Sequence, residues 1–283
     1  TGALDAEHWL RVRPGTDAAL ALGIAGLLLE AKTYDEAFLR AWSNAPLLVR
    51  TDTGRFLRAD ELEPGLPGFA AFDERCDTAV PYDTTRFAVA PERFALHGTR
   101  RIRTRDGEVE CVPAFDRYAE ACAAWPVDRT SAETGVDEHA LRSFAEALGQ
   151  ARSVTYHGWS GVGQHTNATQ TDRAIATLYA LTGSFDAPGG NVVLPGPAVN
   201  PVDAADELDP DQRAKALGLA EYPLGPPAQG WISARALCRA VLSGEPYRVR
   251  AMLGFGSNLL VSQPDPRRTA EALRHLEFFV HLD

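Results

Sequence analysis

The sequence has few sulfur-containing residues, and this shortage limits what the protein can be. Its only methionine is Met252, so there is no initiator methionine, and the chain stops at Asp283 directly after the apolar run 278–280. We expect from this that both ends were cut from a longer polypeptide. The four cysteines are scattered and form no C-x-x-C pair, which argues against a zinc ribbon or an iron–sulfur cluster within the chain. Scattered cysteines in a long chain favour free thiols, and a cytoplasmic over a periplasmic location.

Long apolar runs and dense basic runs are also missing. The best apolar stretch, 18–29, is shorter than the roughly 18 residues that a membrane span needs, so no direct membrane insertion is expected. The formal net charge is −10, and the densest group of arginines, at 100, 101, 103 and 105, is interpreted as exposed positions on a hairpin. Nucleic-acid binding is therefore not predicted. An acidic chain can still bind an anionic ligand through local backbone N–H groups and helix N-termini.

The sequence does have enough material for a core and a clear division. With 283 residues and 45% hydrophobic residues it is expected to form one large or two ordinary domains, at roughly 100–200 residues each. Residues 186–227 are rich in proline and glycine, which is typical of a domain boundary. We therefore predict domains at 1–190 and 191–283.

Strand, loop and helix alternate twice, at 153–181 and 248–282, and this favours an α/β fold with parallel sheets covered by helices. Helices are predicted at 16–31, 34–42, 115–124, 137–148, 166–181, 232–242 and 266–275. Strands are predicted at 8–13, 153–157, 248–253 and 277–282, with hairpins at 47–58 and 100–112 and an irregular excursion at 60–92. In such sheets ligands bind at the carboxyl ends of the strands, so the loops after the strands are the candidate sites.

The first candidate is the turn Pro14-Gly15-Thr16-Asp17, between a predicted strand and a predicted helix. Gly15 allows a positive φ or a close ligand, and the Asp17 carboxylate could accept hydrogen bonds from the ring N–H and amino group of a guanine. The alternative interpretation is an ordinary helix start, in which Thr16 caps the helix and Asp17 favours its positive end.

The second candidate is the glycine-rich segment 158–167, GWSGVGQHTN, which follows a predicted strand and opens a helix. Gly161 and Gly163 let the backbone approach a phosphate or a pterin, and Ser160 and Gln164 supply polar groups. Its spacing, G-x-x-G-x-G, differs from the dinucleotide fingerprint G-x-G-x-x-G, so NAD is not predicted. The alternative is a glycine-rich turn after a buried strand. A lone His165 at a helix start is more typical of capping or packing than of catalysis.

The third candidate is the loop Gly256-Ser257-Asn258, again at the end of a predicted strand. Its short polar side chains lie where ligands bind in such sheets. The alternative is a polar turn with Asn258 in a left-handed conformation.

Taken in this order, the three loops resemble the molybdopterin oxidoreductase family, which includes dimethyl sulfoxide reductase, formate dehydrogenases and nitrate reductases. The matching text is RPGTDAALAL at 13–22, GVGQHTNATQTDRAIATLYALTGSFDAPGGN at 161–191 and GFGSNLLVSQPD at 254–265. The resemblance covers nearly the whole chain and is loosest at 44–112 and 192–230. The middle block is the most specific of the three.

The resemblance implies a cofactor, two molybdopterin guanine dinucleotides that hold one molybdenum or tungsten through dithiolenes. It implies that residues 1–190 form the dinucleotide-binding-like third domain of the family, and that 191–283 form the C-terminal part of the second α/β domain. The metal ligand lies upstream in the family, as does the iron–sulfur motif where one is present, so the fragment alone is expected to be inactive and to carry no catalytic residue. The residues expected to bind the cofactor are Gly15, Thr16, Asp17, Ser160, Gly161, Gly163, Gln164, Gly256, Ser257, Asn258 and Asp283.

By this resemblance the whole protein would be an oxidoreductase that transfers two electrons or an oxygen atom to or from a small-molecule redox substrate, with an electron-transfer subunit or protein as a partner. One alternative is a metal-free structural or electron-transfer subunit of the same fold, as in respiratory NADH dehydrogenase. Another is a free-standing nucleotide-binding module, which predicts measurable GDP affinity for the isolated chain.

Overall fold

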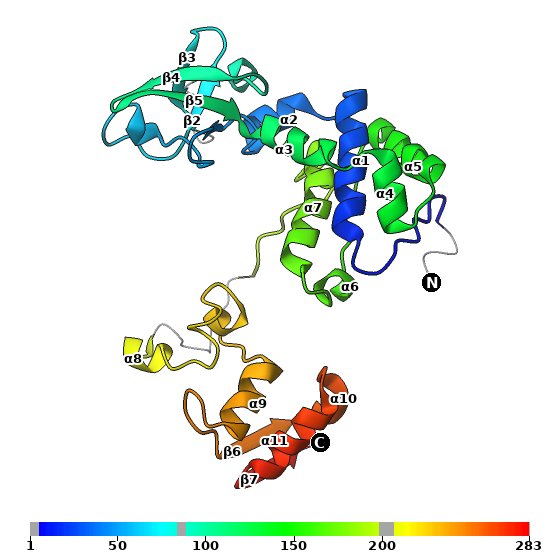
Figure 1. Cartoon of the computed structure of the whole chain (residues 1–283), viewed down its shortest axis with the longest axis vertical. Coiled ribbons are helices and arrows are strands. Elements are labelled where there is room, and N and C mark those ends of the chain that lie inside the picture. The colour runs from blue at the N-terminus through cyan, green and yellow to red at the C-terminus, as the bar shows by residue number, and fades with distance from the viewer. Residues whose placement is uncertain (1–5, 84–88, 198–206, 283) are drawn as a thin grey trace. The chain divides into compact units, whose positions relative to one another are not determined.

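The computed structural model describes residues 6–83, 89–197 and 207–282. Contacts within the chain divide it into two compact units, Thr1–Pro195 and Gly196–Asp283, and each is described by itself (Figure 1). The sequence analysis placed the boundary at residue 190. The assignment of either unit to a particular domain of the family stays a prediction.

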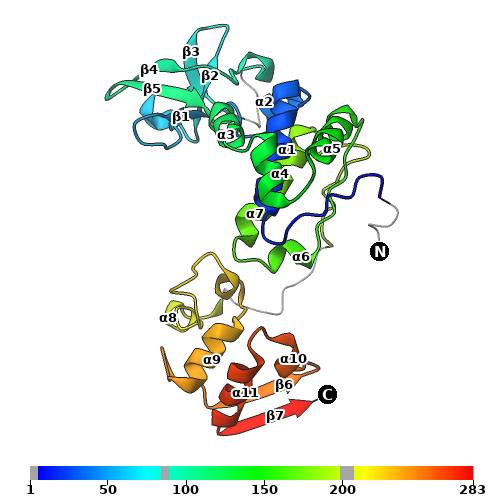
Figure 2. The same ribbon diagram turned by 45° about the vertical axis from the view of Figure 1, so that its right-hand side comes forward.

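Helix α1 (Asp17–Ala31) is the central helix of the first unit. It is apolar nearly all round, as a helix enclosed by neighbours must be, and Ile24, Ala25 and Leu28 are almost fully buried. It packs against α3 (Ala114–Ala123), α4 (Val127–Thr134), α5 (Glu138–Gln150) and α7 (Ala168–Leu181), an arrangement visible in Figure 2. The core of the unit therefore forms around α1.

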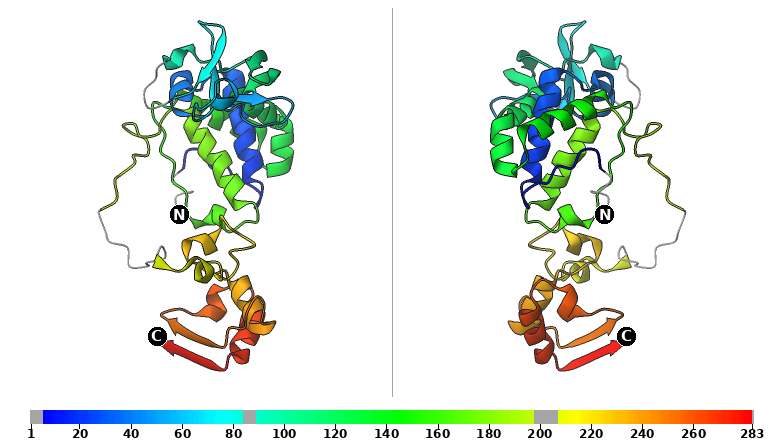
Figure 3. Two further views of the ribbon diagram at one scale, coloured as in Figure 1. Left: turned by 90° about the vertical axis from the view of Figure 1, so that its left-hand side faces the viewer. Right: turned by 90° about the vertical axis from the view of Figure 1, so that its right-hand side faces the viewer.

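Helices α1 and α7 lie side by side and run in the same direction (Figure 3). The evidence is at their C-terminal ends, where the short helix α2 (Glu36–Trp42) begins: the N–H of its N-cap residue Asp35 donates to the carbonyl of Leu181, 2.8 Å away. Gly183 follows α7 at φ +66°, as expected of the residue that ends a helix in a left-handed conformation. Both N-termini consequently lie at the opposite end of the unit.

Between α2 and α3 the chain forms a small antiparallel β region. Its three-stranded sheet has the order β1 (Leu48–Arg50), β5 (Gly107–Pro113) and β4 (Arg100–Thr104), and β2 (Ala70–Asp73) pairs with β3 (Thr78–Pro81). Two single-turn 3-10 helices, η2 (Ala59–Glu61) and η3 (Pro91–Arg93), connect these strands. Both predicted hairpin reversals are present: the Leu57 N–H donates to the Leu48 carbonyl, and Thr104 pairs with Gly107. Strand β2 was missed because all four of its residues are buried, which removes the alternation expected of a strand.

Two predicted strands of the first unit were wrong. Residues 8–13 form no strand, and the Arg13 N–H donates instead to the carbonyl of Thr134 at the end of α4. Residues 153–157 are extended but join no sheet, because side chains take their backbone hydrogen bonds: the Val154 N–H donates to Ser184 Oγ and the Tyr156 N–H to Asn191 Oδ1. The parallel sheet expected within 1–190 is therefore not found in the described part of this unit, whose strand pairs are antiparallel.

The second unit contains the parallel pair that the sequence predicts. Strand β6 (Ala251–Phe255) pairs in parallel with β7 (Phe278–Leu282), with Leu253 opposite Val280. Helices α10 (Leu259–Ser262) and α11 (Pro266–His275) connect the two strands, and α9 (Ala234–Leu242) packs against α11. The unit begins with α8 (Pro210–Arg213) and η5 (Pro226–Gln229). The mixed helix-and-sheet character of the fold is thus confirmed.

No helix in the described part of the chain is both long and apolar enough to cross a lipid bilayer. Within the same residues, no cluster of three or more His, Cys, Asp or Glu side chains is arranged to hold a metal ion. Three of the four free cysteines are buried, and only Cys76 is exposed.

The close packing of α1 can be tested with two of its glycines. An alanine methyl at Gly23 would collide with the buried side chain of Thr130, so Gly23→Ala should lower the free energy of unfolding by about 1–3 kcal/mol. At Gly26 the nearest atom to such a methyl would be the Cys122 carbonyl oxygen at 3.5 Å, an ordinary contact. Gly26→Ala is the matched control and should raise stability by about 0.5–1 kcal/mol through helix propensity. Urea unfolding followed by circular dichroism measures both; equal effects of the two variants would contradict this packing.

Candidate functional site

The turn before α1 has the predicted glycine conformation and an uncapped helix start. Gly15 has φ +88° and no atom within 4 Å of the position that a Cβ would take. The Thr16 hydroxyl donates back to the Arg13 carbonyl at 2.7 Å and makes no cap hydrogen bond to α1. Thr16 therefore does not play the capping role that the alternative interpretation gave it. The first-turn N–H groups of α1, which have no partner inside the helix, receive no side-chain cap.

The extended segment 153–157 runs along α7 toward its N-terminal end. It starts at the Val154 N–H, bound to Ser184 beyond the C-terminus of α7 at 3.0 Å. Farther along, the Tyr156 hydroxyl donates to Asp172 Oδ1, in the second turn of α7, at 2.6 Å. Burial raises the pKa of Tyr156 to about 12, and its hydrogen bond to Asp172 acts in the same direction. The phenol thus stays protonated at neutral pH and keeps this bond.

Asn191 substitutes for a neighbouring strand in holding this segment. Its side-chain Oδ1 accepts from the Tyr156 N–H, and its Nδ2 donates to the Tyr156 carbonyl, both at 2.7 Å. Asn191 is itself held by the buried Tyr179 of α7, whose hydroxyl accepts from the Asn191 N–H at 2.8 Å. The position of the segment, and of the glycine-rich loop that follows it, is thus fixed by residues at the far end of α7.

The second motif forms the short helix α6 (Ser160–Gly163) and the entrance to α7. Ser160, Gly161, Gly163 and Gln164 are all exposed, and no atom lies within 4 Å of a Cβ built at either glycine. The side chain of Asn167, the N-cap residue of α7, makes no cap hydrogen bond. Among the described α-helices, α3, α4 and α6 also begin without a side-chain cap, whereas six begin with one; their N-cap residues are Asp35, Asp137, Asp209, Ser233, Asn258 and Asp265.

The structure therefore brings the first two predicted motifs together. Because α1 and α7 are parallel neighbours, their uncapped N-termini lie at one end of the unit, and α6 lies beside the N-terminal end of α1 in both Figure 1 and Figure 2. Among the described residues, neither the Asp17 carboxylate nor the Gln164 side-chain amide has a hydrogen-bond partner. We refer to this end of the unit, made of residues 15–17 and 158–170, as the helix-start face.

The third motif lies in the other unit. Gly256 has φ +54° after β6, and Asn258 caps the four-residue helix α10 by accepting from the Val261 N–H at 3.3 Å. A local turn thus accounts for the Asn258 side chain, but the left-handed conformation of the alternative interpretation was wrong, because Asn258 is extended at φ −103° and Gly256 takes the positive φ. The position Asp283 lies outside the described residues. His165 is exposed, and among the described residues it is seen only to accept, through its carbonyl, a hydrogen bond that the Ala168 N–H donates.

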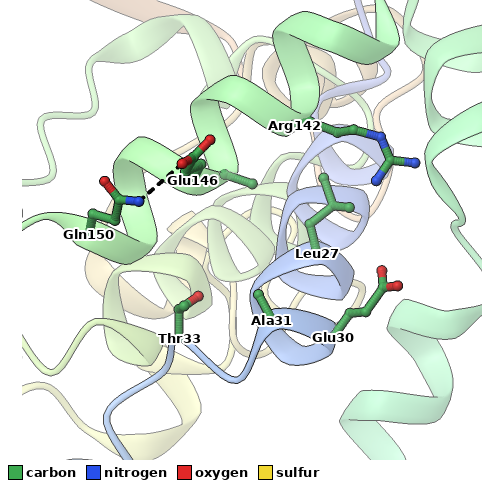
Figure 4. A pocket seen from close by; sticks show the side chains of 8 residues that line it. Leu27, Glu30, Ala31, Thr33, Arg142, Glu146 and Gln150 are labelled. Atoms are coloured by element: carbon green, nitrogen blue, oxygen red, sulfur yellow. Dashed lines mark hydrogen bonds between the residues drawn. The ribbon is translucent and has the colours of Figure 1, made fainter.

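A separate groove of about 470 Å³ lies between α5 and the C-terminal end of α1 (Figure 4). Glu30, Arg142 and Glu146 on its walls are exposed, and Glu146 accepts from the Gln150 amide at 3.1 Å. No buried unpaired polar group is among its lining residues. It has the character of a solvated surface groove between two packed helices.

The residues that support the loop, chiefly Tyr156, Asp172 and Asn191, were not predicted from the sequence. The only signal in the sequence is Asn191, the last residue of the block APGGN. No neighbouring residue indicates that its side chain binds Tyr156, 35 positions earlier.

Comparison with known proteins identifies the class to which the chain is related. It is 27% identical to a dopamine dehydroxylase of Eggerthella lenta over 99% of this chain and 36% of that protein. It is 26% identical to the alpha subunit of a dimethylsulfide dehydrogenase from Rhodovulum sulfidophilum over 66% of this chain and 21% of that protein. Among solved structures, acetylene hydratase from Pelobacter acetylenicus superposes with a TM-score of 0.67 and 18% identity, over 99% of this chain and 33% of that one, and this shows a shared fold. A scan against protein-family models found no match.

Dehydrogenase and reductase subunits are thus among the relatives, and the chain spans between about a fifth and about a third of the length of the proteins that it matches. They include a respiratory nitrate reductase and a tetrathionate reductase. These relatives are molybdopterin oxidoreductases, and the resemblance of the chain to that family, drawn from the sequence, is confirmed.

The support of the glycine-rich loop by Asn191 is testable. Asn191→Ala removes both hydrogen bonds to the Tyr156 backbone, each worth about 0.5–1.5 kcal/mol, so the Tyr156 amide should exchange its hydrogen about tenfold faster or more. Asn167→Ala is the control, because that side chain makes no cap bond. Hydrogen exchange read by mass spectrometry on a peptide covering 153–159 is the measurement. Unchanged protection in Asn191→Ala would show that something else holds the segment.

Proposed function

We propose that the first unit contributes part of the binding site for a bis-molybdopterin guanine dinucleotide cofactor, and that the helix-start face is where it binds. The observation that carries this proposal is the convergence of two uncapped helix N-termini with the exposed glycine loop. Ser160 and Gln164 would meet the pterin part, and Gly15, Thr16 and Asp17 the nucleotide part. The loop Gly256-Ser257-Asn258 and Asp283 are proposed to contribute from the other unit.

The donor groups of this face fit such a cofactor. Helix N-termini carry partial positive charge and unpaired N–H groups, so they suit the pyrophosphate of a dinucleotide. The unpartnered Asp17 carboxylate suits the donor edge of guanine, and the Gln164 amide, with a donor and an acceptor, suits the mixed edge of a pterin. Gly15 leaves open space where a ligand can approach the backbone. This use of helix starts is the dinucleotide-binding-like feature that we propose for the unit.

For the whole protein we propose a molybdenum- or tungsten-dependent oxidoreductase acting on a small-molecule substrate, with an electron-transfer subunit as partner. When bound, the metal cofactor would supply the two-electron or oxygen-atom chemistry, while the residues of this chain position it. The relatives named as reductase and dehydrogenase subunits support this proposal over a metal-free structural subunit.

Replacing Gly15 tests the proposal against a matched control. Gly15→Ala and Gly65→Ala both place alanine at a positive φ, +88° and +86°, with open space around the new methyl, so each should cost about 1–2 kcal/mol of stability. Only Gly15→Ala should also lose most of the bound cofactor, because its methyl would occupy the space of the ligand. Cofactor is measured as the fluorescent oxidised pterin and the GMP released by acid from the purified protein. Equal cofactor content in the two variants, or none in the unmodified protein, contradicts the proposal.

Asp17 should determine base preference. Asp17→Asn replaces one of the two acceptor oxygens by a donor, so the protein should lose its preference for GDP over ADP, by roughly tenfold for one charge-assisted hydrogen bond. Glu138→Gln at the first position of α5 is the control for the loss of a helix-start charge alone. Calorimetric titration of both nucleotides gives the preference. A GDP preference that survives in Asp17→Asn would assign guanine recognition elsewhere.

A further inference from the structure

The extended segment before α6 presents one row of side chains outward. Successive residues of an extended chain point to opposite sides, and here Val154 and Tyr156 are half-buried whereas Thr155, His157 and Trp159 are exposed. Val154 and Tyr156 carry the hydrogen bonds that fasten the segment to Ser184, Asn191 and Asp172. The exposed side chains therefore extend from a backbone that these hydrogen bonds fix in position.

Two rings of this row are stacked. The His157 and Trp159 rings are 6.3 Å apart between centroids and within 17° of parallel, and Trp159 is 83% exposed. An indole that is almost wholly exposed to water does not contribute the large favourable free energy of burying an aromatic side chain. The exposed indole offers a flat, π-rich surface, which suits another planar ring better than an irregular apolar side chain does.

The surroundings of Trp159 indicate the kind of ring. Trp159 is the N-cap residue of α6 and thus belongs to the helix-start face, which also carries the uncapped start of α7 and the unpartnered Asp17 and Gln164. A planar ring with donor and acceptor edges, linked to phosphate, matches all of these groups. Guanine and pterin share such a ring, the fused 2-amino-4-oxopyrimidine system.

We infer that Trp159, backed by His157, is a stacking surface for a 2-amino-4-oxopyrimidine ring of the ligand bound at the helix-start face. This rests on the proposed function and adds to it a binding residue that is not among the predicted cofactor-binding residues. Trp159 holds the ring by its face, and the polar groups nearby hold it by its edge. Guanine and pterin are the two sources of this ring, and they can be distinguished by titration.

The test titrates the chain with three probes: GDP, 6-carboxypterin and pyrophosphate. Trp159→Ala should weaken binding of one ring-bearing probe about tenfold, the effect typical of a lost base–aromatic stack, and leave pyrophosphate unchanged. The probe that loses affinity identifies the ring. Trp159→Phe should restore most of the affinity and Trp159→Leu should not, because leucine keeps the apolar surface but not the ring. Trp231→Ala, at a tryptophan 70% exposed in the other unit, is the control.

Quenching of tryptophan fluorescence locates the contact: the ring-bearing probe should quench the unmodified protein more than Trp159→Phe. Binding of both ring probes by Trp159→Leu as tightly as by the unmodified protein overturns the inference, as does the absence of ring-probe binding to the unmodified protein. The cofactor content of purified protein separates this from the proposed function. If Trp159→Ala retains full pterin and GMP and binds GDP normally, only the stacking role fails; if the unmodified protein contains no pterin, the proposed function itself fails.

Discussion

The parallel packing of α1 and α7 is the constraint on which the candidate site depends. Both helices are of similar length, and the Asp35–Leu181 backbone hydrogen bond ties their C-terminal ends together. Their N-termini must therefore share the other end. If one helix ran the opposite way, the two starts would be separated by roughly 20 Å, the length of such a helix, and could not act on one ligand. The orientation of two helices thus decides whether two weak local signals form one site.

The loop between these helix starts is positioned from a distance. A strand in a sheet is held by a neighbouring strand, but 153–157 is held by the side chains of Ser184 and Asn191, which belong to the turn after α7. That turn is fastened to Tyr179, whose hydroxyl donates to the Ser184 carbonyl at 2.6 Å. These side chains satisfy the backbone N–H and C=O groups of a segment that has no neighbouring strand, as a half-buried segment requires. As a result, α7 positions both the glycine-rich loop and the helix N-terminus beside that loop.

What the sequence could predict follows from the range of each interaction. The predicted starts of α5 and α11, at 137 and 266, are confirmed to within one residue, because the caps Asp137 and Asp265 act over only three residues. The same local rule failed at Thr16, where the hydroxyl turns to the Arg13 carbonyl. Helix α4 was missed because VDRTSAET is largely polar and lacks an apolar stripe. For the site, the glycines and Asp17 were visible in the sequence. The hydrogen bonds between Asn191 and Tyr156 could not be predicted, because the two residues are 35 positions apart and the sequence between them has no periodic pattern that indicates the contact.

The two helix starts differ in charge, and the difference suggests how an anionic dinucleotide would be oriented. The first turn of α7 contains no acidic residue, whereas α1 begins with Asp17. Each helix start contributes about half a positive charge, which a carboxylate in the first turn offsets. Phosphate is thus favoured at α7, whose first turn has no carboxylate, and disfavoured beside Asp17. A base with donor N–H groups has the opposite preference.

The net charge of −10 does not prevent an anion from binding at α7, because neighbouring N–H groups act over a few ångströms, whereas distant surface charges are screened within about 10 Å in salt solution. Base at α1 and phosphate at α7 is the orientation that the local charges favour.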